Sequence, residues 1–137
     1  MAKLKDSDTL TEGVRVRAIA QYIPAQSDPE KKRYFFAYRV TISNESESEV
    51  KLLSRHWIII DSDGSRTDVQ GPGVVGEQPT LEPGKSFTYT SFCPLPTDFG
   101  TMEGFYQMRR EDGYEFQAEV GRFFLAANAE IEENVVF

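Results

Sequence analysis

The chain has 137 residues, of which 39% are hydrophobic and 12% aromatic, and its formal net charge is −7 at pH 7. A chain of this length forms a single domain with one hydrophobic core. Glutamate clusters at residues 45–49 and 130–133 supply much of the charge, and no basic stripe balances them. This distribution argues against binding to duplex nucleic acid or to an anionic membrane. No apolar run reaches the roughly 18 residues that a transmembrane helix needs.

The first residues and the cysteine content predict a cytoplasmic protein. Asp6 and Asp8 stand where a secretory signal peptide would have its apolar segment. Cys93 is the only cysteine, so it cannot form an internal disulfide, and its presence fits a reducing compartment.

Alternating apolar and polar residues predict strands along most of the chain. Residues 1–13 are polar and have no period, so we expect a flexible N-terminal lead-in. Segments 14–23 and 34–42 alternate with a period of two, which is typical of half-buried strands. Residues 50–61 form the longest apolar stretch and predict a central strand.

In a regular pleat, this central strand places Trp57 on one face with Leu53 and Ile59, and His56 on the other face with Leu52. Trp57 is the expected core anchor, as in immunoglobulin-like sandwiches. In the same regular pleat, Arg55 would lie on the face of Trp57, where its charge would need a partner or access to solvent. A bulge in the strand would change this placement.

The rest of the chain reads as short strands joined by tight turns. Asp63-Gly64 and Asp112-Gly113 are hairpin signals, because aspartate and glycine tolerate positive φ. Further strands are predicted at residues 67–70, 86–93, 101–109 and 114–125. Apolar residues do not recur at helical spacing over ten or more positions, so the pattern predicts an all-β, antiparallel β-sandwich. The single domain is expected to span residues 14–127, followed by an acidic tail at 128–137.

Gly71-Pro72-Gly73-Val74-Val75-Gly76 matches the glycine pattern that cradles a pyrophosphate when a helix follows it. Pro79 and Pro83 prevent such a helix, and no acidic residue occurs between Lys85 and Thr97 to bind a ribose. We therefore favour a structural loop whose glycines adopt positive φ. A phosphate-binding nest is the weaker alternative.

Candidate catalytic and metal-binding groups are few. His56 is the only histidine, and one histidine with one cysteine is too few for a catalytic triad or a zinc site. The sequence thus predicts no enzyme, no catalytic residues, no cofactor and no metal site. Asp61 and Asp63 precede Gly64 as in a calcium loop, but the later acidic ligands of an EF-hand are missing. A weak divalent site that adds Asp68 is a less favoured alternative to a plain hairpin.

Four ordered motifs give the chain a family resemblance, covering about residues 14–125. They are Ser54-Arg55-His56-Trp57, Gly71-x-Gly73-Val74-Val75-Gly76-x-Gln78-Pro79, Leu81-x-Pro83-Gly84 and Gly100-x-Met102-x-Gly104-x-Tyr106-x-Met108. Together they resemble the bacterial ApaG family. The resemblance implies a fibronectin type III-like or immunoglobulin-like sandwich, and it brings no established catalytic residues.

The family's bacterial members have been associated with cobalt resistance and magnesium efflux, and with gene neighbourhoods that contain a diadenosine tetraphosphate hydrolase. Similar domains occur in a eukaryotic F-box protein and in a DNA-polymerase-δ-interacting protein. The resemblance therefore implies an adaptor-like role with a link to divalent cation homeostasis.

We predict a non-catalytic module that binds a protein partner, whose identity the sequence leaves open; a homo-oligomer is compatible with it. Two loops carry apolar residues that either cap one end of the sandwich or form an exposed docking patch. The predicted contact residues are Gly71, Gly73, Val74, Val75, Gly76, Leu95 and Phe99. The first alternative is a nucleotide- or phosphate-binding protein, with or without hydrolytic activity, that uses the Gly71–Gly76 loop. The next is a metal-ion sensor.

Overall fold

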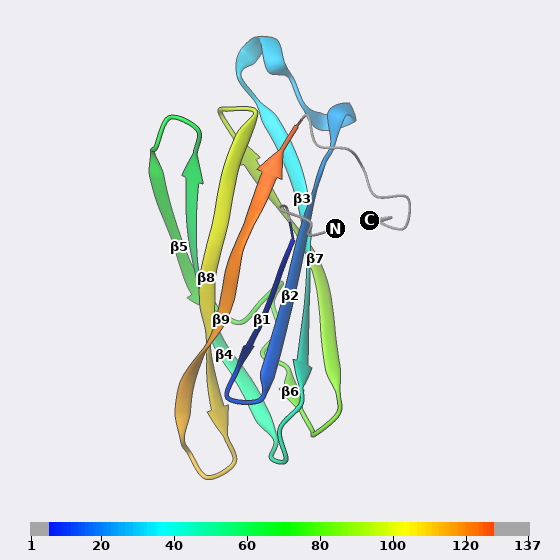
Figure 1. Ribbon diagram of the computed structural model, residues 1–137, viewed down its shortest axis with the longest axis vertical. Coiled ribbons are helices and arrows are strands. Elements are labelled where there is room, and N and C mark those ends of the chain that lie inside the picture. The colour runs from blue at the N-terminus through cyan, green and yellow to red at the C-terminus, as the bar shows by residue number, and fades with distance from the viewer. Residues whose placement is uncertain (1–5, 128–137) are drawn as a thin grey trace.

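The computed structural model describes residues 6–127, which form nine strands and two short 3₁₀ turns (Figure 1). The elements are β1 (Ser7–Thr11), β2 (Val14–Tyr22), η1 (Pro24–Gln26), η2 (Pro29–Lys31), β3 (Tyr34–Asn44), β4 (Val50–Asp61), β5 (Arg66–Pro72), β6 (Thr80–Leu81), β7 (Ser86–Leu95), β8 (Phe99–Arg110) and β9 (Glu115–Ala126). Within this range, no helix is long and apolar enough to cross a membrane.

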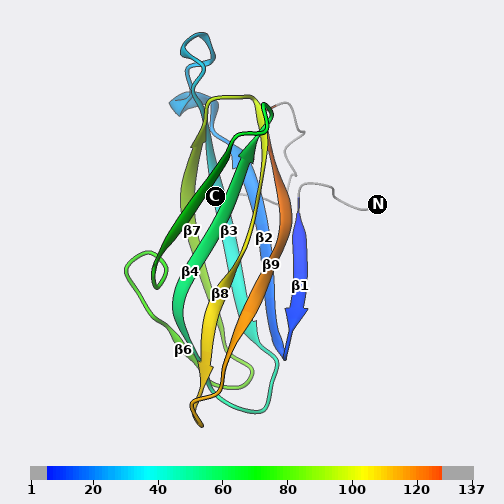
Figure 2. The same ribbon diagram turned by 90° about the vertical axis from the view of Figure 1, so that its left-hand side faces the viewer.

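The strands form two antiparallel sheets that pack face to face, so the predicted β-sandwich is confirmed. The first sheet has the order β1-β2-β3-β7, and the second has the order β5-β4-β8-β9 with β6 also paired to β4. Viewed onto the second sheet, β5 and β7 lie at one side of the sandwich and β1 and β9 lie at the other (Figure 2).

The alternation seen in the sequence places the core between the two sheets. Val14 and Val16 of β2 are fully buried, and so are Val40 and Ile42 of β3. The aromatic part of the core is centred on Trp57, whose ring is 2% exposed. It makes edge contacts with three rings, at centroid distances of 5.4 Å, 6.1 Å and 5.9 Å to Tyr38, Tyr106 and Phe123.

The central strand departs from a regular pleat by one residue. Leu52 pairs with Met108 and Ser54 with Gln107, so Leu53 is an extra residue, a β-bulge. Leu52 and Trp57 therefore both face the core, at 1% and 2% exposed. The expectation that Leu52 shares the His56 face was wrong, because a single inserted residue reverses the alternation.

The N-terminal expectation also needs correction. Ser7–Thr11 form the edge strand β1, paired antiparallel with β2, whereas a flexible lead-in was expected over residues 1–13. The strand has no apolar period because it is held by its backbone ladder and by contacts with β9. The amide of Glu119 donates to Thr11 Oγ1 at 3.2 Å, and a side chain at Gly121 would collide with Thr9. The predicted acidic tail at residues 128–137 lies outside the described residues.

Trp57→Ala should destabilise the fold by about 3–5 kcal/mol, because it removes a buried ring that contacts three others. Trp57→Phe is the matched control. It keeps an aromatic ring and removes an indole N–H that has no hydrogen-bond partner in the described structure, so we expect a loss of only about 1–2 kcal/mol. Urea unfolding measures the free energy of unfolding of both variants. An equal value for Trp57→Ala and the wild type would show that the ring is not a core anchor.

Candidate functional site

The glycine-rich segment after β5 docks on the bulge of β4. The carbonyl of Leu53, the extra residue, accepts hydrogen bonds from the Gly73 amide at 2.9 Å and from Gln78 Nε2 at 2.8 Å. The Leu52 amide donates to the Pro79 carbonyl at 3.0 Å. The bulge therefore supplies the backbone groups that fix both ends of this loop, which we call the glycine loop (residues 71–79).

Arg55 is the second anchor of the glycine loop. Its Nη1 donates to the carbonyls of Pro72 and Gly73, at 3.0 Å and 2.9 Å. Gly71 lies opposite Arg55 in the ladder, and a Cβ at Gly71 would be 3.1 Å from Arg55 Nη2. Glycine at position 71 therefore lets the guanidinium lie against β5. The partner that Arg55 required is thus the loop backbone, bound by charge-assisted hydrogen bonds.

The tip of the glycine loop is a tight turn. Val74 and Glu77 exchange two backbone hydrogen bonds, of 2.8 Å and 2.9 Å. The two residues between them have positive φ, 43° at Val75 and 82° at Gly76, which is the pattern of a type I′ turn. A β-branched residue rarely adopts positive φ, so Val75 is strained. Gly73 also has positive φ, of 61°, and a side chain there would collide with the Glu77 carbonyl.

These contacts bear on the phosphate alternative. The amides of Gly73, Val74 and Glu77 all donate within the protein, to Leu53, Glu77 and Val74. In the described structure, the loop leads into β6 and into no helix. It therefore provides neither a helix N-terminus nor a continuous row of free amides, which are the two features that hold a phosphate at such a motif.

The four apolar loop residues of the predicted patch do not form one surface. Val74 and Leu95 are buried, at 0% and 5% exposed, whereas Val75 and Phe99 are exposed, at 52% and 42%. Gly71, where the glycine loop begins, pairs with Arg55 of β4. Gly100, next to Phe99, pairs with Asp61, which is six positions further along β4. That separation is about 20 Å in a strand. Val74 and Leu95 thus fold inward, as the capping interpretation requires. The exposed residues Val75 and Phe99 lie at two separate places.

Phe99 belongs instead to an apolar surface on the outer side of the second sheet. Its ring stacks on Phe124 at a centroid distance of 5.7 Å. The ladder places further partly exposed apolar residues on the same side. We call this surface the aromatic face, and it consists of Ile58, Ile60, Phe99, Phe105 and Phe124. Sequence reasoning missed it, although the apolar residues on both faces of β4 were a visible signal.

Paired charges lie beside and within the aromatic face, since the ladder places Glu103 opposite Ile58. On β5, Asp68 accepts hydrogen bonds from Arg66 Nε at 2.7 Å and bonds His56 Nε2 at 2.8 Å. The Arg66 guanidinium, followed by His56, holds the pKa of the Asp68 carboxyl well below its usual range. Arg122 of β9 pairs with Glu103 of β8 at 3.1 Å. His56 lies on the outer surface of the second sheet, with its ring centroid 5.1 Å from that of Phe105.

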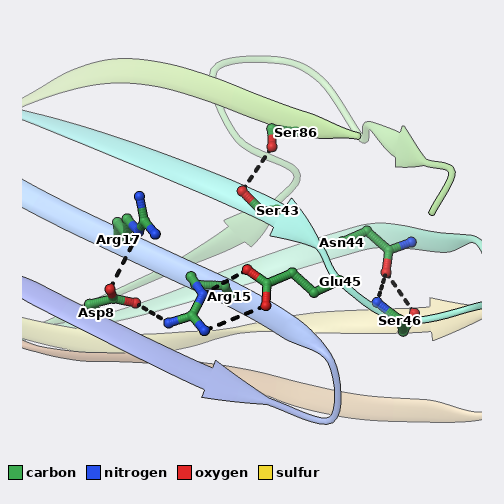
Figure 3. A network of polar contacts seen from close by, with 8 residues as sticks. All are labelled: Asp8, Arg15, Arg17, Ser43, Asn44, Glu45, Ser46 and Ser86. Atoms are coloured by element: carbon green, nitrogen blue, oxygen red, sulfur yellow. Dashed lines mark hydrogen bonds and ion pairs between the residues drawn. The ribbon is translucent and has the colours of Figure 1, made fainter. Parts of the chain in front are cut away.

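The outer side of the first sheet carries arginines that are already neutralised (Figure 3). Arg15 bonds to Asp8 at 2.9 Å and to Glu45 at 2.7 Å, and Arg17 pairs with Asp8 at 3.4 Å. Asn44, which is fully buried, accepts hydrogen bonds from the backbone and hydroxyl of Ser46. This network fixes the turn after β3 and leaves these arginines paired.

The three aspartates of the divalent-site alternative do not converge. Asp61 Oδ1 accepts hydrogen bonds from the amides of Asp63 and Ser65 within the hairpin turn, at 2.9 Å and 3.1 Å. Asp68 is bound instead to Arg66 and His56. Among residues 6–127, no group of three or more His, Cys, Asp or Glu side chains is placed to hold a metal ion.

Cys93 lies in β7 with its side chain toward the core, at 4% exposed. Burial raises the pKa of its thiol to about 12. It therefore stays protonated at neutral pH, which removes the thiolate that a nucleophile needs.

Gly73→Ala should cost at least about 2 kcal/mol more than Gly76→Ala. Both positions have positive φ, so both variants carry the strain of a left-handed alanine, about 1–2 kcal/mol. Only Gly73→Ala adds a collision with the Glu77 carbonyl, because a Cβ at Gly76 meets open space. Chemical unfolding of both variants checks this, and equal losses would show that the loop is not closed as described.

Cys93 should react with a thiol reagent at pH 8 only as fast as the protein unfolds. Because the folded pKa of about 12 lies above the ordinary value of 9.0, the thiol's contribution to stability is present below pH 9 and is lost as the pH rises toward 12. The rate at which the reagent labels Cys93 at pH 8, measured with and without urea, tests whether unfolding limits the reaction. Rapid labelling without urea would contradict the burial of this thiol.

Comparison with known proteins identifies the family. The family model described as ApaG domain matches residues 24–110. Protein ApaG of Dechloromonas aromatica is 52% identical over 121 residues, which cover 88% of this chain and 95% of the relative. Protein ApaG of Aromatoleum aromaticum is 50% identical over 113 residues, which cover 82% of this chain and 89% of the relative.

The fold agrees with a solved structure of the same kind. A crystal structure described as an ApaA protein from Bordetella pertussis superposes with a TM-score of 0.83 and 44% sequence identity, and the match covers 85% of this chain and 95% of that one. Sequence motifs, family model and fold therefore agree, and the chain belongs to the ApaG domain family.

Proposed function

We propose that the protein is a non-catalytic binding module that docks a protein partner on its aromatic face. The observation that carries the proposal is a group of five exposed or partly exposed large apolar side chains on the outer side of the second sheet, with the stacked rings of Phe99 and Phe124 at one end. Large apolar side chains gathered on one surface of a charged, acidic protein mark a contact site. The Arg66–Asp68 pair lies along the β5 side of this surface, and the Glu103–Arg122 pair lies within it, so the charges among the apolar side chains are already paired.

The chemistry of the described residues supports binding over catalysis. His56 and Asp68 form a hydrogen-bonded pair, but in residues 6–127 no hydroxyl or thiol donates to the His56 ring. Cys93 is buried and protonated. A nucleophile with an adjacent base, the usual requirement for covalent hydrolysis, is therefore not assembled in this part of the chain.

The proposal places the protein in the cytoplasm, where a lone thiol stays reduced. The proposal also accounts for the family's association with cobalt resistance and magnesium efflux. The partner protein would act in metal homeostasis, and this chain would recognise that partner.

Phe99→Ser and Phe124→Ser should each weaken partner binding by about tenfold or more, because both rings belong to the proposed interface. The melting temperature should change little, because both rings lie on the outer side of the second sheet and not in the core. Val75→Ser is the matched control, since Val75 is similarly exposed but lies on the glycine loop. Partners are captured from native bacterial cytosol and identified by mass spectrometry. Calorimetry with the purified partner then gives the dissociation constant for each variant.

Two results would overturn this assignment. If Val75→Ser loses the partner and Phe99→Ser keeps it, the glycine loop is the docking surface. If diadenosine tetraphosphate or inorganic phosphate raises the melting temperature by mass action and the polyphosphate is hydrolysed, the nucleotide alternative is correct. The same titration with Mg²⁺ and Co²⁺ tests a metal-sensing role.

A further inference from the structure

We propose that the free edge of β7 binds an extended peptide segment of a partner protein, which adds a strand to the first sheet. This surface is separate from the aromatic face, because β7 belongs to the other sheet. Within the described residues, β7 pairs only with β3. It is ten residues long, and no described strand pairs with its other edge.

The register identifies the backbone groups on this open edge. The Phe35 carbonyl accepts from Ile23, on the β2 side of β3, and the Asn44 amide donates to Lys85, on the β7 side. Backbone direction alternates along a strand, so the even-numbered residues of β3 bond to β7. Their partners in β7 are odd-numbered, from Phe87 to Cys93. The amides and carbonyls of Thr88, Thr90 and Phe92 therefore point away from the sheet.

The side chains of this edge do not protect it from pairing. Edge strands are normally blocked by charged residues, proline or a bulge. β7 contains no charged residue, and its Pro94 comes after the open row. The side chains beside the row, Thr88, Thr90 and Phe92, are exposed, with Phe92 at 55%. By contrast, the β5 edge carries Arg66, Asp68 and Pro72.

The space beside β7 suits one added strand. The residues of β5 are exposed, apart from Gly71, which is partly exposed. Even the inward-facing Val69 and Thr67 are exposed, although their ladder partners are Trp57 and Ile59. A hollow of about 150 Å³ between Ile59, Thr67 and Leu95 lies at the end of β7. An added strand would direct alternate side chains toward this uncovered inner side, and a residue that continues the strand beyond the level of Phe92 would meet the hollow.

The shape of the same side favours a peptide over a second copy of the chain. In Figure 2, the loop between β5 and β6 extends outward past β7. A second copy joined edge to edge through β7 would have to fit its own loop and its own second sheet beside this one. A single extended segment carries neither, so it needs less space beside β7.

These contacts define the chemistry of the peptide. It spans about seven residues, from the level of Ser86 to that of Phe92, in an extended conformation. Its inward side chains are uncharged and apolar, because they are removed from water beside Val69. Its outward side chains are β-branched or aromatic, because these pair best with threonine and phenylalanine across a ladder.

The test uses the full chain and linear peptides displayed on phage. Peptides selected on the wild type should show this alternation, and Thr90→Pro should weaken their binding by about tenfold or more, because it removes the central outward amide. Proline is tolerated there, since that amide does not bond to β3. Thr90→Val keeps the amide and should bind like the wild type. Thr88→Pro replaces Thr90→Pro if the latter fails to fold.

Hydrogen exchange provides the second measurement. A bound peptide should protect the amides of Thr88, Thr90 and Phe92, whereas those of Phe87, Tyr89 and Ser91 are protected with or without it. Equal binding by the proline variants, protection confined to the aromatic face, or selection of no peptide above the Thr90→Pro background would each overturn the proposal. A wild type that dimerises in sedimentation while Thr90→Pro stays monomeric would also overturn it, in favour of a second copy.

Discussion

The bulge at Leu53 is the constraint on which the rest of the structure depends. One extra residue in the central strand turns Leu52 and Trp57 toward the same core, and Arg55 toward the open side of the sandwich. It also frees the Leu53 carbonyl to accept two hydrogen bonds from the glycine loop. Core packing and loop docking therefore have a common cause, since both require the register shift that the bulge introduces.

The two sides of the sandwich are closed in different ways. At one side, β1 packs along β9, where Gly121 leaves space for Thr9. At the other side, no strand among residues 6–127 does this, and the glycine loop closes part of the opening by inserting the buried side chain of Val74. The need to fold and dock this loop explains why the motif contains three glycines. Gly71 makes room for Arg55, Gly73 makes room for the Glu77 carbonyl, and Gly76 completes the turn.

A motif that resembles a phosphate cradle is thus occupied with holding the fold together, and the two proposed contact surfaces lie elsewhere. The aromatic face and the β7 edge belong to different sheets and present different chemistry, side chains in one case and backbone groups in the other. A module with both could hold a folded surface and an extended segment together. This arrangement suits a recognition protein, in which a rigid sandwich keeps the contact surfaces in fixed relation.

The sequence by itself determined the sandwich, because a period of two and the turn residues are local properties that survive in any β context. It also determined the family, through four motifs at set spacing, and the burial of Trp57. Only the tertiary structure decided the register of β4, the pairing of polar β1, and the separation of Val75 from Phe99. These depend on hydrogen bonds and contacts between residues far apart in the chain, which spacing does not encode. The open edge of β7 was likewise invisible in the sequence, since a strand is an edge only by its place in the sheet.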